Sequence, residues 1–459
     1  MVGKFTHPLV AAAWTWMPWT WMQWLVSLSE DFGLPLALSP MILRAFLALT
    51  LVLVAGSASA APAAVRPAPA VRPAPAKAPV PPMMFYVVKG APDACGRGCD
   101  SWIAAEGQID AGAAPRFRKF LRQLRGRSLP IYCASPGGNL DQALAMGAML
   151  REKPAIARVA RTVVSDCGFE AQDSEICLKL KQSGRELHGE LWTRGASCNS
   201  ACPYLMLGAT TREIAPDAVM AVHSPRVVVH FRNGTPTREM RAAATERGLD
   251  RADRMLRSYI VKMGADIGLL DLARTVKFED SHVLTREEIA RFGIDRRELA
   301  DTPWIFESGT RGMVRKIVTQ RDDGDKAYRM SQWRLFCFNT EQFELDYQRP
   351  AVTSSTIPTV LISNDVSISM FFRSTPVRTP GFEIWGLRMT RDSLSALAKE
   401  PEFDLTETSQ GQDGRRRTLK AKFSSAGLAG ALDRLLATCP PAKAPAPVQA
   451  TGSRESAAK

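Results

Sequence analysis

The residues best suited to nucleophilic chemistry lie in one short segment, Cys198-Asn199-Ser200-Ala201-Cys202, and His223 follows Ser200 by 23 positions. A serine hydroxyl becomes an effective nucleophile when a basic imidazole lies within hydrogen-bond reach. Ser200 precedes a short apolar helix predicted over 201–207, where the helix dipole and free N–H groups favour a developing oxyanion. The alternative is that Ser200 only caps this helix and His223 is a structural loop residue. Spacing alone favours that alternative.

A second candidate is the turn Ser135-Pro136-Gly137-Gly138, between a buried strand predicted at 130–134 and a helix that Asn139 can cap. Two glycines let the backbone approach a ligand closely and direct N–H groups at it. Many strand–helix turns contain Gly-Gly, so this turn alone is a weak signal.

The elements around these motifs alternate between strand and helix, which indicates an α/β core. Strands are predicted at 85–88, 102–109, 130–134, 159–164, 190–193, 219–222 and 282–284. Helices are predicted at 117–124, 140–150, 201–207 and 238–263, and a capping box at Thr285 predicts one more. The strand at 219–222 leads directly into His223.

Taken in order, the segment 102–109, the Ser-Pro-Gly-Gly turn, the Ser200 segment and Ala221-Val222-His223-Ser224-Pro225 resemble the Clp protease proteolytic subunit and the crotonase-like superfamily. The resemblance covers about residues 85–300 and is closest to an exported, periplasmic branch. It implies a Clp/crotonase-like β-β-α superhelical core with Ser200 as nucleophile and His223 as base. The N–H groups of Ala201 and of Gly138, or Gly137, would form the oxyanion hole.

The third catalytic residue departs from the family pattern. Counting back from the turn Phe292-Gly293-Ile294-Asp295 places Ser281 at the position of the family's aspartate. A one-residue bulge would place Asp280 there instead. Without an acid to hold its tautomer, His223 would be a poorer base, which puts efficient proteolysis in doubt.

The targeting signals indicate export. Residues 41–60 have the basic, apolar and small-residue order of a signal peptide, with cleavage expected after Ala60 and a periplasmic or secreted location. Residues 1–40 hold five of the ten tryptophans. They are either an interfacial membrane segment or, as we prefer, a gene-model extension. Residues 61–82 are an Ala/Pro-rich linker.

All nine cysteines follow residue 60, which fits an oxidising compartment. We expect a free, buried thiol at Cys133. The predicted pairs are Cys95–Cys99, Cys167–Cys177, Cys198–Cys202 and Cys337–Cys439. The chain has no Cys-x-x-Cys pair and only five histidines, so we expect neither metal nor cofactor.

From about residue 304 the pattern changes to alternating strands, so we divide the folded chain into a Clp/crotonase-like domain at 83–305 and a small β-rich α+β domain at 306–440. Residues 441–459 should be a disordered tail.

The expected function is a periplasmic serine hydrolase, peptidase-like, acting on peptide or envelope polymer. The alternatives are an inactive module of the same fold that binds such a polymer, and a structural envelope component. The net charge of +13 is compatible with contact at a membrane or wall, whereas export excludes nucleic acid. The sequence is also compatible with a homo-oligomer.

Overall fold

The structure is a computed structural model that describes residues 80–231, 235–309, 312–321, 327–351, 359–363, 369–372, 375–410 and 414–442. These residues belong to one compact unit, Ala78–Lys459. Outside the described residues lie residues 1–40, the predicted signal peptide, most of the predicted linker and most of the predicted tail. Across the described ranges, no helix is long and apolar enough to cross a membrane.

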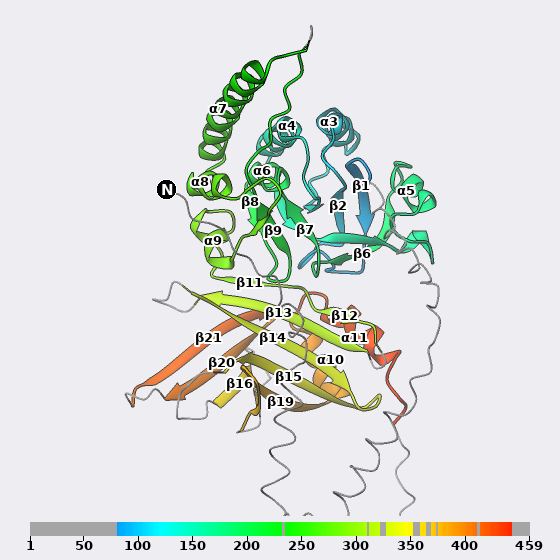
Figure 1. The fold of residues 1–459 in the computed structure, drawn as a ribbon. Helices are drawn as coiled ribbons and strands as arrows, with labels where there is room; N and C mark the ends of the chain where they lie inside the picture. The colour runs from blue at the N-terminus through cyan, green and yellow to red at the C-terminus, as the bar shows by residue number, and fades with distance from the viewer. Residues whose placement is uncertain are drawn as a thin grey trace, which may run out of the picture. The chain divides into compact units, whose positions relative to one another are not determined.

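The first half of the described chain is a mixed α/β structure built on a seven-stranded sheet (Figure 1). In spatial order its strands are β5 (Arg161–Val164), β6 (Leu187–Trp192), β1 (Met84–Lys89), β2 (Ser101–Glu106), β3 (Ile131–Ala134), β4 (Ile156–Val159) and β8 (Thr211–Glu213). Strands β2, β3, β4 and β8 run parallel to one another, whereas β1 is antiparallel to β2. The segment predicted as one strand at 159–164 is two strands that belong to different places in this sheet.

A second, three-stranded sheet carries the residues of the candidate site. Its order is β10 (His282–Val283), β9 (Val219–Val222) and β7 (Ser197–Asn199). The bridge between Ser135 and Cys198 connects it to the end of β3 in the large sheet. The polypeptide therefore brings the Gly-Gly turn and the Ser200 segment together.

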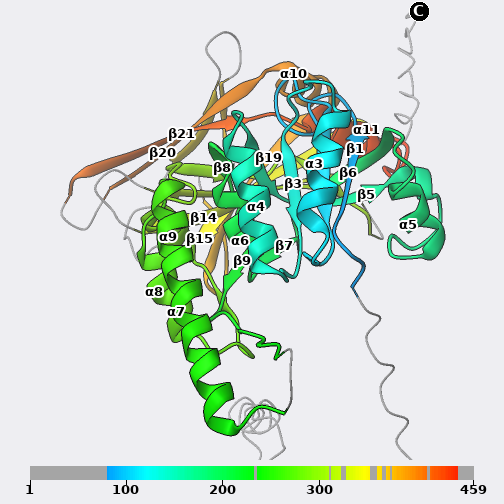
Figure 2. The same ribbon diagram turned by 90° about the horizontal axis from the view of Figure 1, so that it is seen from above.

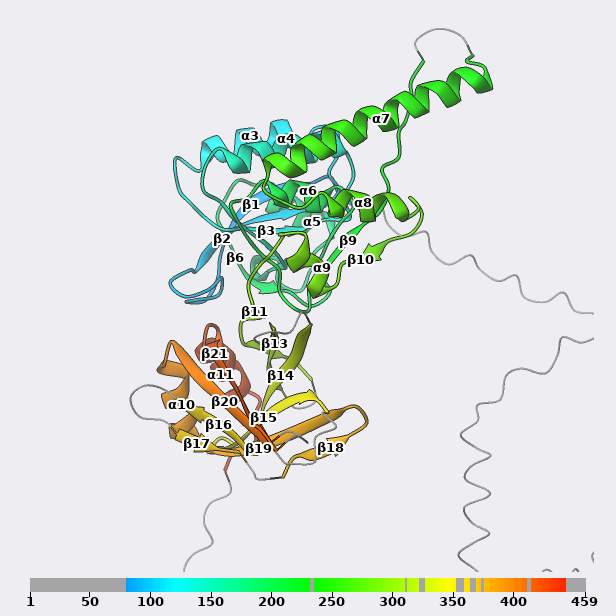
Figure 3. The same cartoon turned by 90° about the vertical axis from the view of Figure 1, so that its left-hand side faces the viewer.

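The helices of this half pack against its sheets largely through their apolar faces. They are α3 (Ala113–Gln123), α4 (Leu140–Arg151), α5 (Glu175–Lys181), α6 (Cys202–Leu207), α7 (Arg238–Lys262), α8 (Gly268–Thr275) and α9 (Arg286–Arg291). Phe117 of α3 and Leu144 of α4 pack in one core with Ile131 and Cys133 of β3. In Figures 2 and 3 the first turns of α7 extend beyond the other elements of this half. Only Leu256, Tyr259 and Ile260 of α7 are buried.

Two helices begin where the sequence predicts, because a side chain caps the first turn of each. The Asn139 side chain accepts a hydrogen bond from the N–H of Gln142 at the start of α4. Thr285 and Glu288 form the predicted capping box of α9. Such caps satisfy backbone N–H groups that have no partner within the helix.

Two arginines hold the ends of α6 and α7 together. Arg151 Nη2 donates to the carbonyl oxygens of Leu207 and Met263, each at 3.0 Å. Arg212 Nη1 donates to the same two oxygens at 2.9 and 3.1 Å. Cationic donors suit the carbonyl-rich C-terminal end of a helix. The helix that follows Ser200 is therefore anchored at its far end.

The second half is antiparallel. Its larger sheet has the order β11 (Leu299–Asp301), β13 (Met313–Arg321), β14 (Tyr328–Cys337), β15 (Gln342–Pro350), β19 (Phe382–Thr390) and β18 (Val377–Thr379), and β12 (Ile305–Glu307) also pairs with β13. The smaller sheet has the order β17 (Ser369–Phe371), β16 (Thr359–Ser363), β20 (Glu402–Gln410) and β21 (Arg416–Ser424).

Helices α10 (Arg391–Lys399) and α11 (Leu428–Leu436) complete this half. Its core contains Trp333, Trp385, Phe403 and Phe423, all at most 1% exposed. Strand β11 lies before residue 305, yet it hydrogen-bonds to β13 of this half.

The four predicted disulfides are confirmed: Cys95–Cys99, Cys167–Cys177, Cys198–Cys202 and Cys337–Cys439. Cys133 is a buried free thiol, and burial raises its pKa to about 12. Cys177 lies on α5, a helix that the sequence analysis did not predict within the segment 165–196. Four disulfides are consistent with an oxidising, extracytoplasmic environment.

Candidate functional site

Ser200 follows directly after β7, which pairs in parallel with β9. Asn199 is opposite Ala221 in this pair, and the Ser200 N–H donates to the Ala221 carbonyl oxygen at 2.8 Å. The two strands therefore end side by side, one at Ser200 and the other at His223. Ser200 has φ +60°, a left-handed conformation that few non-glycine residues adopt. Such conformations are enriched at functional sites, where surrounding structure holds them.

The Gly-Gly turn lies against this serine. The Ser135 N–H donates to Ser197 O at 2.8 Å, and the Asn199 N–H donates to Ser135 O at 3.0 Å. A β-carbon on Gly137 would come within 2.6 Å of Ser200 Cβ and 2.9 Å of the Ala201 nitrogen. Only glycine allows this approach, since Gly137 also has φ +96°.

Two backbone N–H groups at this junction have no acceptor among the described residues: those of Gly138 and Ala201. Gly137 does not share this property, because its N–H donates to Ser135 Oγ at 3.1 Å. Buried N–H groups are nearly always paired, and Ala201 is only 3% exposed. Of the two glycines that the sequence analysis left open, Gly138 is the one with a free donor.

His223 is held by its own neighbour in the chain. Its Nδ1 lies 2.8 Å from the Ser224 carbonyl oxygen. A carbonyl oxygen can only accept, so Nδ1 carries the proton and Nε2 is the basic nitrogen. The ring also packs edge-on against Phe278, with 5.0 Å between the ring centroids. Its tautomer and orientation are thus set without a carboxylate.

Neither candidate for the third residue is bonded to His223. Asp280 and Ser281 are both exposed, and within the described residues neither side chain forms a hydrogen bond or ion pair with His223. The described residues also show no hydrogen bond between Ser200 and His223. The strand register brings the ends of β7 and β9 together.

The sequence analysis missed a second histidine beside the site. His282 in β10 is opposite Val222 in β9, and its Nε2 lies 2.8 Å from Glu288 Oε2. Burial raises the pKa of Glu288, but the bonds from His282 and the Thr285 N–H outweigh burial and lower it. The sequence predicts only the capping box at Thr285 here, and it does not predict the register of β9 with β10.

The Cys198–Cys202 disulfide encloses Ser200 in a short covalent loop. Cys198 lies within β7 and is fully buried, and all six residues of α6 are buried. Asn199 Oδ1, beside Ser200, is buried without a hydrogen-bond partner in the described structure. The serine is therefore flanked on both sides by buried, disulfide-linked residues, and one polar atom next to it is unsatisfied.

Within the described residues, no group of three or more His, Cys, Asp or Glu side chains is arranged to hold a metal ion. No protein-family model matches the chain, and no curated protein sequence matches it. Among solved structures, it is similar to a mutant of the 1510-N membrane-bound stomatin-specific protease, with 16% identity and a TM-score of 0.25. That match covers 41% of this chain and 73% of the protease. A likeness of this size says nothing about the residues of the site.

Proposed function

We propose that this protein is an exported serine hydrolase, peptidase-like, in which Ser200 is the nucleophile and His223 the base. The observation that carries the proposal is the left-handed Ser200, in contact with Gly137 and followed by the unpartnered Ala201 N–H. The order of motifs, which resembles the Clp protease family, agrees with the same assignment.

The chemistry follows from these positions. Ser200 Oγ attacks the carbonyl carbon of the substrate while His223 Nε2 takes the hydroxyl proton. The carbonyl oxygen becomes an oxyanion that accepts hydrogen bonds from the N–H groups of Ala201 and Gly138. His223 then gives its proton to the leaving group, and water hydrolyses the acyl-enzyme by the same route. The Ser224 carbonyl keeps Nδ1 protonated in place of an aspartate.

The second candidate function is a binding module without turnover, which holds peptide or envelope polymer at the same turn. Two observations favour it: His223 has no carboxylate partner in the described residues, and Ser200 is not hydrogen-bonded to it. In serine hydrolases the aspartate contributes strongly to rate, so its loss lowers activity without removing the binding surface.

The test is covalent labelling of the disulfide-bonded mature chain with a fluorophosphonate. We expect labelling of the wild type, none of Ser200→Ala, and labelling of His223→Ala slowed by about 100-fold or more. Ser183→Ala is the matched control, because Ser183 is an exposed serine outside the site. Equal labelling of wild type and Ser200→Ala would show that Ser200 is not the nucleophile. A wild type that binds peptide but is never labelled would establish the binding module.

A further inference from the structure

A cavity of about 130 Å³ lies away from Ser200, between the α/β half and the β-rich half. Its α/β wall includes Tyr132, Arg158, Thr193 and Glu213, and its β-rich wall includes Asp301, Lys316 and Ala426. Arg297, in the connection between the halves, also lines it. This volume is well above the roughly 10–15 Å³ that one water molecule requires, and it is enough for one small ion.

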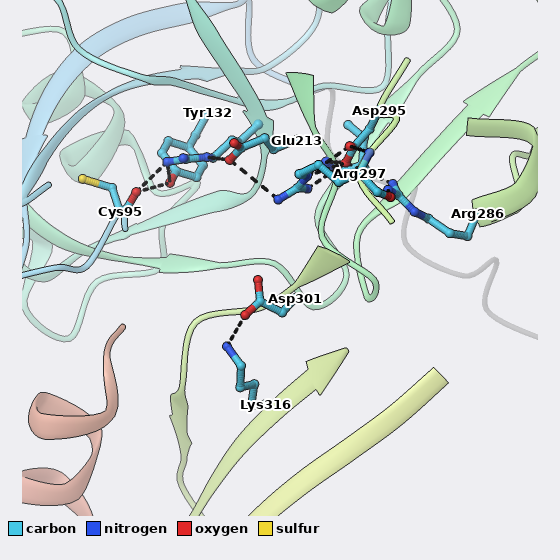
Figure 4. Close-up of polar contacts among 10 residues, drawn as sticks. Cys95, Tyr132, Glu213, Arg286, Asp295, Arg297, Asp301 and Lys316 are labelled. Atoms are coloured by element: carbon cyan, nitrogen blue, oxygen red, sulfur yellow. Dashed lines mark hydrogen bonds and ion pairs between the residues drawn. The ribbon is translucent and has the colours of Figure 1, made fainter. Parts of the chain in front are cut away.

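A chain of hydrogen bonds and ion pairs runs from Cys95 to Arg286 on the α/β side (Figure 4). Arg158 Nε lies 2.6 Å from Glu213 Oε2, and its Nη1 donates to Cys95 O and the Tyr132 hydroxyl. Arg297 binds Asp295 through Nε and Nη2. Asp295 is also paired with Arg286 behind the wall.

The opposite wall holds a wholly buried lysine. Lys316 Nζ lies 2.5 Å from Asp301 Oδ2 and donates to Thr302 O at 2.6 Å. Burial lowers its pKa, and Asp301 opposes that shift. A lysine with no exposed surface is kept in a protein only where charged or polar groups surround it.

Some guanidinium N–H groups at this cavity make no hydrogen bond within the described residues. Among the described residues, Arg158 Nη2 has no hydrogen-bond partner, and Arg297 Nη1 reaches only Glu213 Oε2, at 3.9 Å. The hydroxyl of Thr193, which is 5% exposed, also has no partner.

The charges do not balance either. The charged side chains that line the cavity are three cations, Arg158, Arg297 and Lys316, and two carboxylates, Glu213 and Asp301. Adding Asp295 and Arg286 behind them still leaves one positive charge in excess.

We propose that this cavity binds a small oxyanion, a carboxylate or a phosphate, held by the free guanidinium N–H groups of Arg158 and Arg297. Guanidinium groups are the preferred partners of both anions because their donors match the spacing of two oxygens. A bound anion would neutralise the excess charge and contact both halves of the chain at once. This site is independent of the proposed hydrolase chemistry.

The test uses thermal unfolding of the disulfide-bonded mature chain, titrated with sodium phosphate in one series and sodium acetate in another, with sodium chloride holding ionic strength constant. We expect at least one series to raise the unfolding midpoint saturably, by about 2–4 °C. A response to phosphate alone identifies a phosphate-type ligand, and a response to acetate alone identifies a carboxylate.

Three variants locate the effect. Ala215 also lines the cavity, on the α/β side. Ala426→Leu and Ala215→Leu therefore fill the cavity from opposite walls without changing charge, and each should abolish the shift. Arg158→Lys keeps the charge but removes the planar pair of donors, and should weaken apparent affinity by about 10-fold. Each variant is compared with its own midpoint without anion, so a change in basal stability does not obscure the result.

The control is Arg388→Gln, which removes an exposed arginine paired with Glu344 outside the cavity. It should keep the full shift. The proposal is overturned if neither anion acts beyond sodium chloride, if both filled variants retain the shift, or if Arg388→Gln weakens apparent affinity as much as Arg158→Lys does.

Discussion

Gly137 lies directly against Ser200: a β-carbon on the glycine would come within 2.6 Å of Ser200 Cβ and 2.5 Å of Asn199 O. The turn and the serine therefore cannot change independently. A methyl group at Gly137 must displace the backbone on either side of Ser200, including the Ala201 N–H.

Gly137→Ala should abolish fluorophosphonate labelling. The matched control is Gly184→Ala, because Gly184 also has positive φ, +76°, but has no atom near its would-be β-carbon. Gly184→Ala should lose about 1 kcal/mol of stability from the strained backbone alone. Gly137→Ala should lose more, because its methyl group must also displace Asn199 O and Ser200. Only Gly137→Ala should lose labelling while remaining folded by circular dichroism. Normal labelling of Gly137→Ala would contradict the close packing of the turn on Ser200.

Asp280→Asn should change the labelling rate by less than about 2-fold, whereas His223→Ala should slow it by about 100-fold or more. The reason is that the Ser224 carbonyl, not Asp280, accepts the Nδ1 proton of His223. Ser281→Ala should behave as Asp280→Asn does. A drop of 100-fold or more in Asp280→Asn would instead assign Asp280 the role of the family's aspartate.

Asp295 should make stability depend on pH in the acid range. Burial alone would raise its pKa, but Arg297 and then Arg286 outweigh burial and hold the pKa at about 2. Because the folded pKa lies below the ordinary value of 3.8, the stabilisation is complete above about pH 4 and is lost as pH falls towards 2. Its size is about 2 kcal/mol.

Asp295→Asn should therefore lower the free energy of unfolding in urea by about 2 kcal/mol at pH 7, and by progressively less below pH 4. Asp433→Asn, at an exposed position, should have little effect at either pH. A difference between wild type and Asp295→Asn that stays constant down to pH 2 would argue against the ion pairs with Arg286 and Arg297.

Cys133 should be the one reactive thiol of the protein, and only after unfolding. Eight cysteines are paired, and burial raises the pKa of the Cys133 thiol to about 12, so little thiolate exists near neutral pH. Iodoacetamide should add nothing to the native protein and one carbamidomethyl group in denaturant, as measured by mass spectrometry. Modification of the native protein would contradict burial of this thiol.

The Cys337–Cys439 disulfide should be a major contributor to stability. It joins the end of β14 to the residues after α11 across a sequence separation of 102. Replacing both cysteines with alanine should lower the free energy of unfolding by about 4–5 kcal/mol in the chain-entropy estimate. Replacing Cys95 and Cys99, separated by only four residues, should cost less. The two double variants can be compared by urea unfolding, and an equal loss in both would contradict this ranking.

Several features of this protein were predictable from sequence because local chemistry decides them. Asn139 and Thr285 cap their helices as expected, since a cap needs only a side-chain oxygen and the next three residues. The disulfides also follow from sequence: three pairs are close in the chain, and the fourth joins two ends of the β-rich half. The strand that leads into His223 was read from its short apolar run.

Tertiary structure alone decided how these pieces meet. No local pattern reveals that β9 lies between β7 and β10, so neither the pairing of His282 with Val222 nor its contact with Glu288 could be predicted. The partner of His223 Nδ1 is a backbone carbonyl, which carries no signature in the residue type. The cavity between the two halves combines Arg158, Arg297 and Lys316 from distant parts of the chain. Sequence specifies which groups are available, but strand register and the packing of the two halves decide which of them come within hydrogen-bond distance.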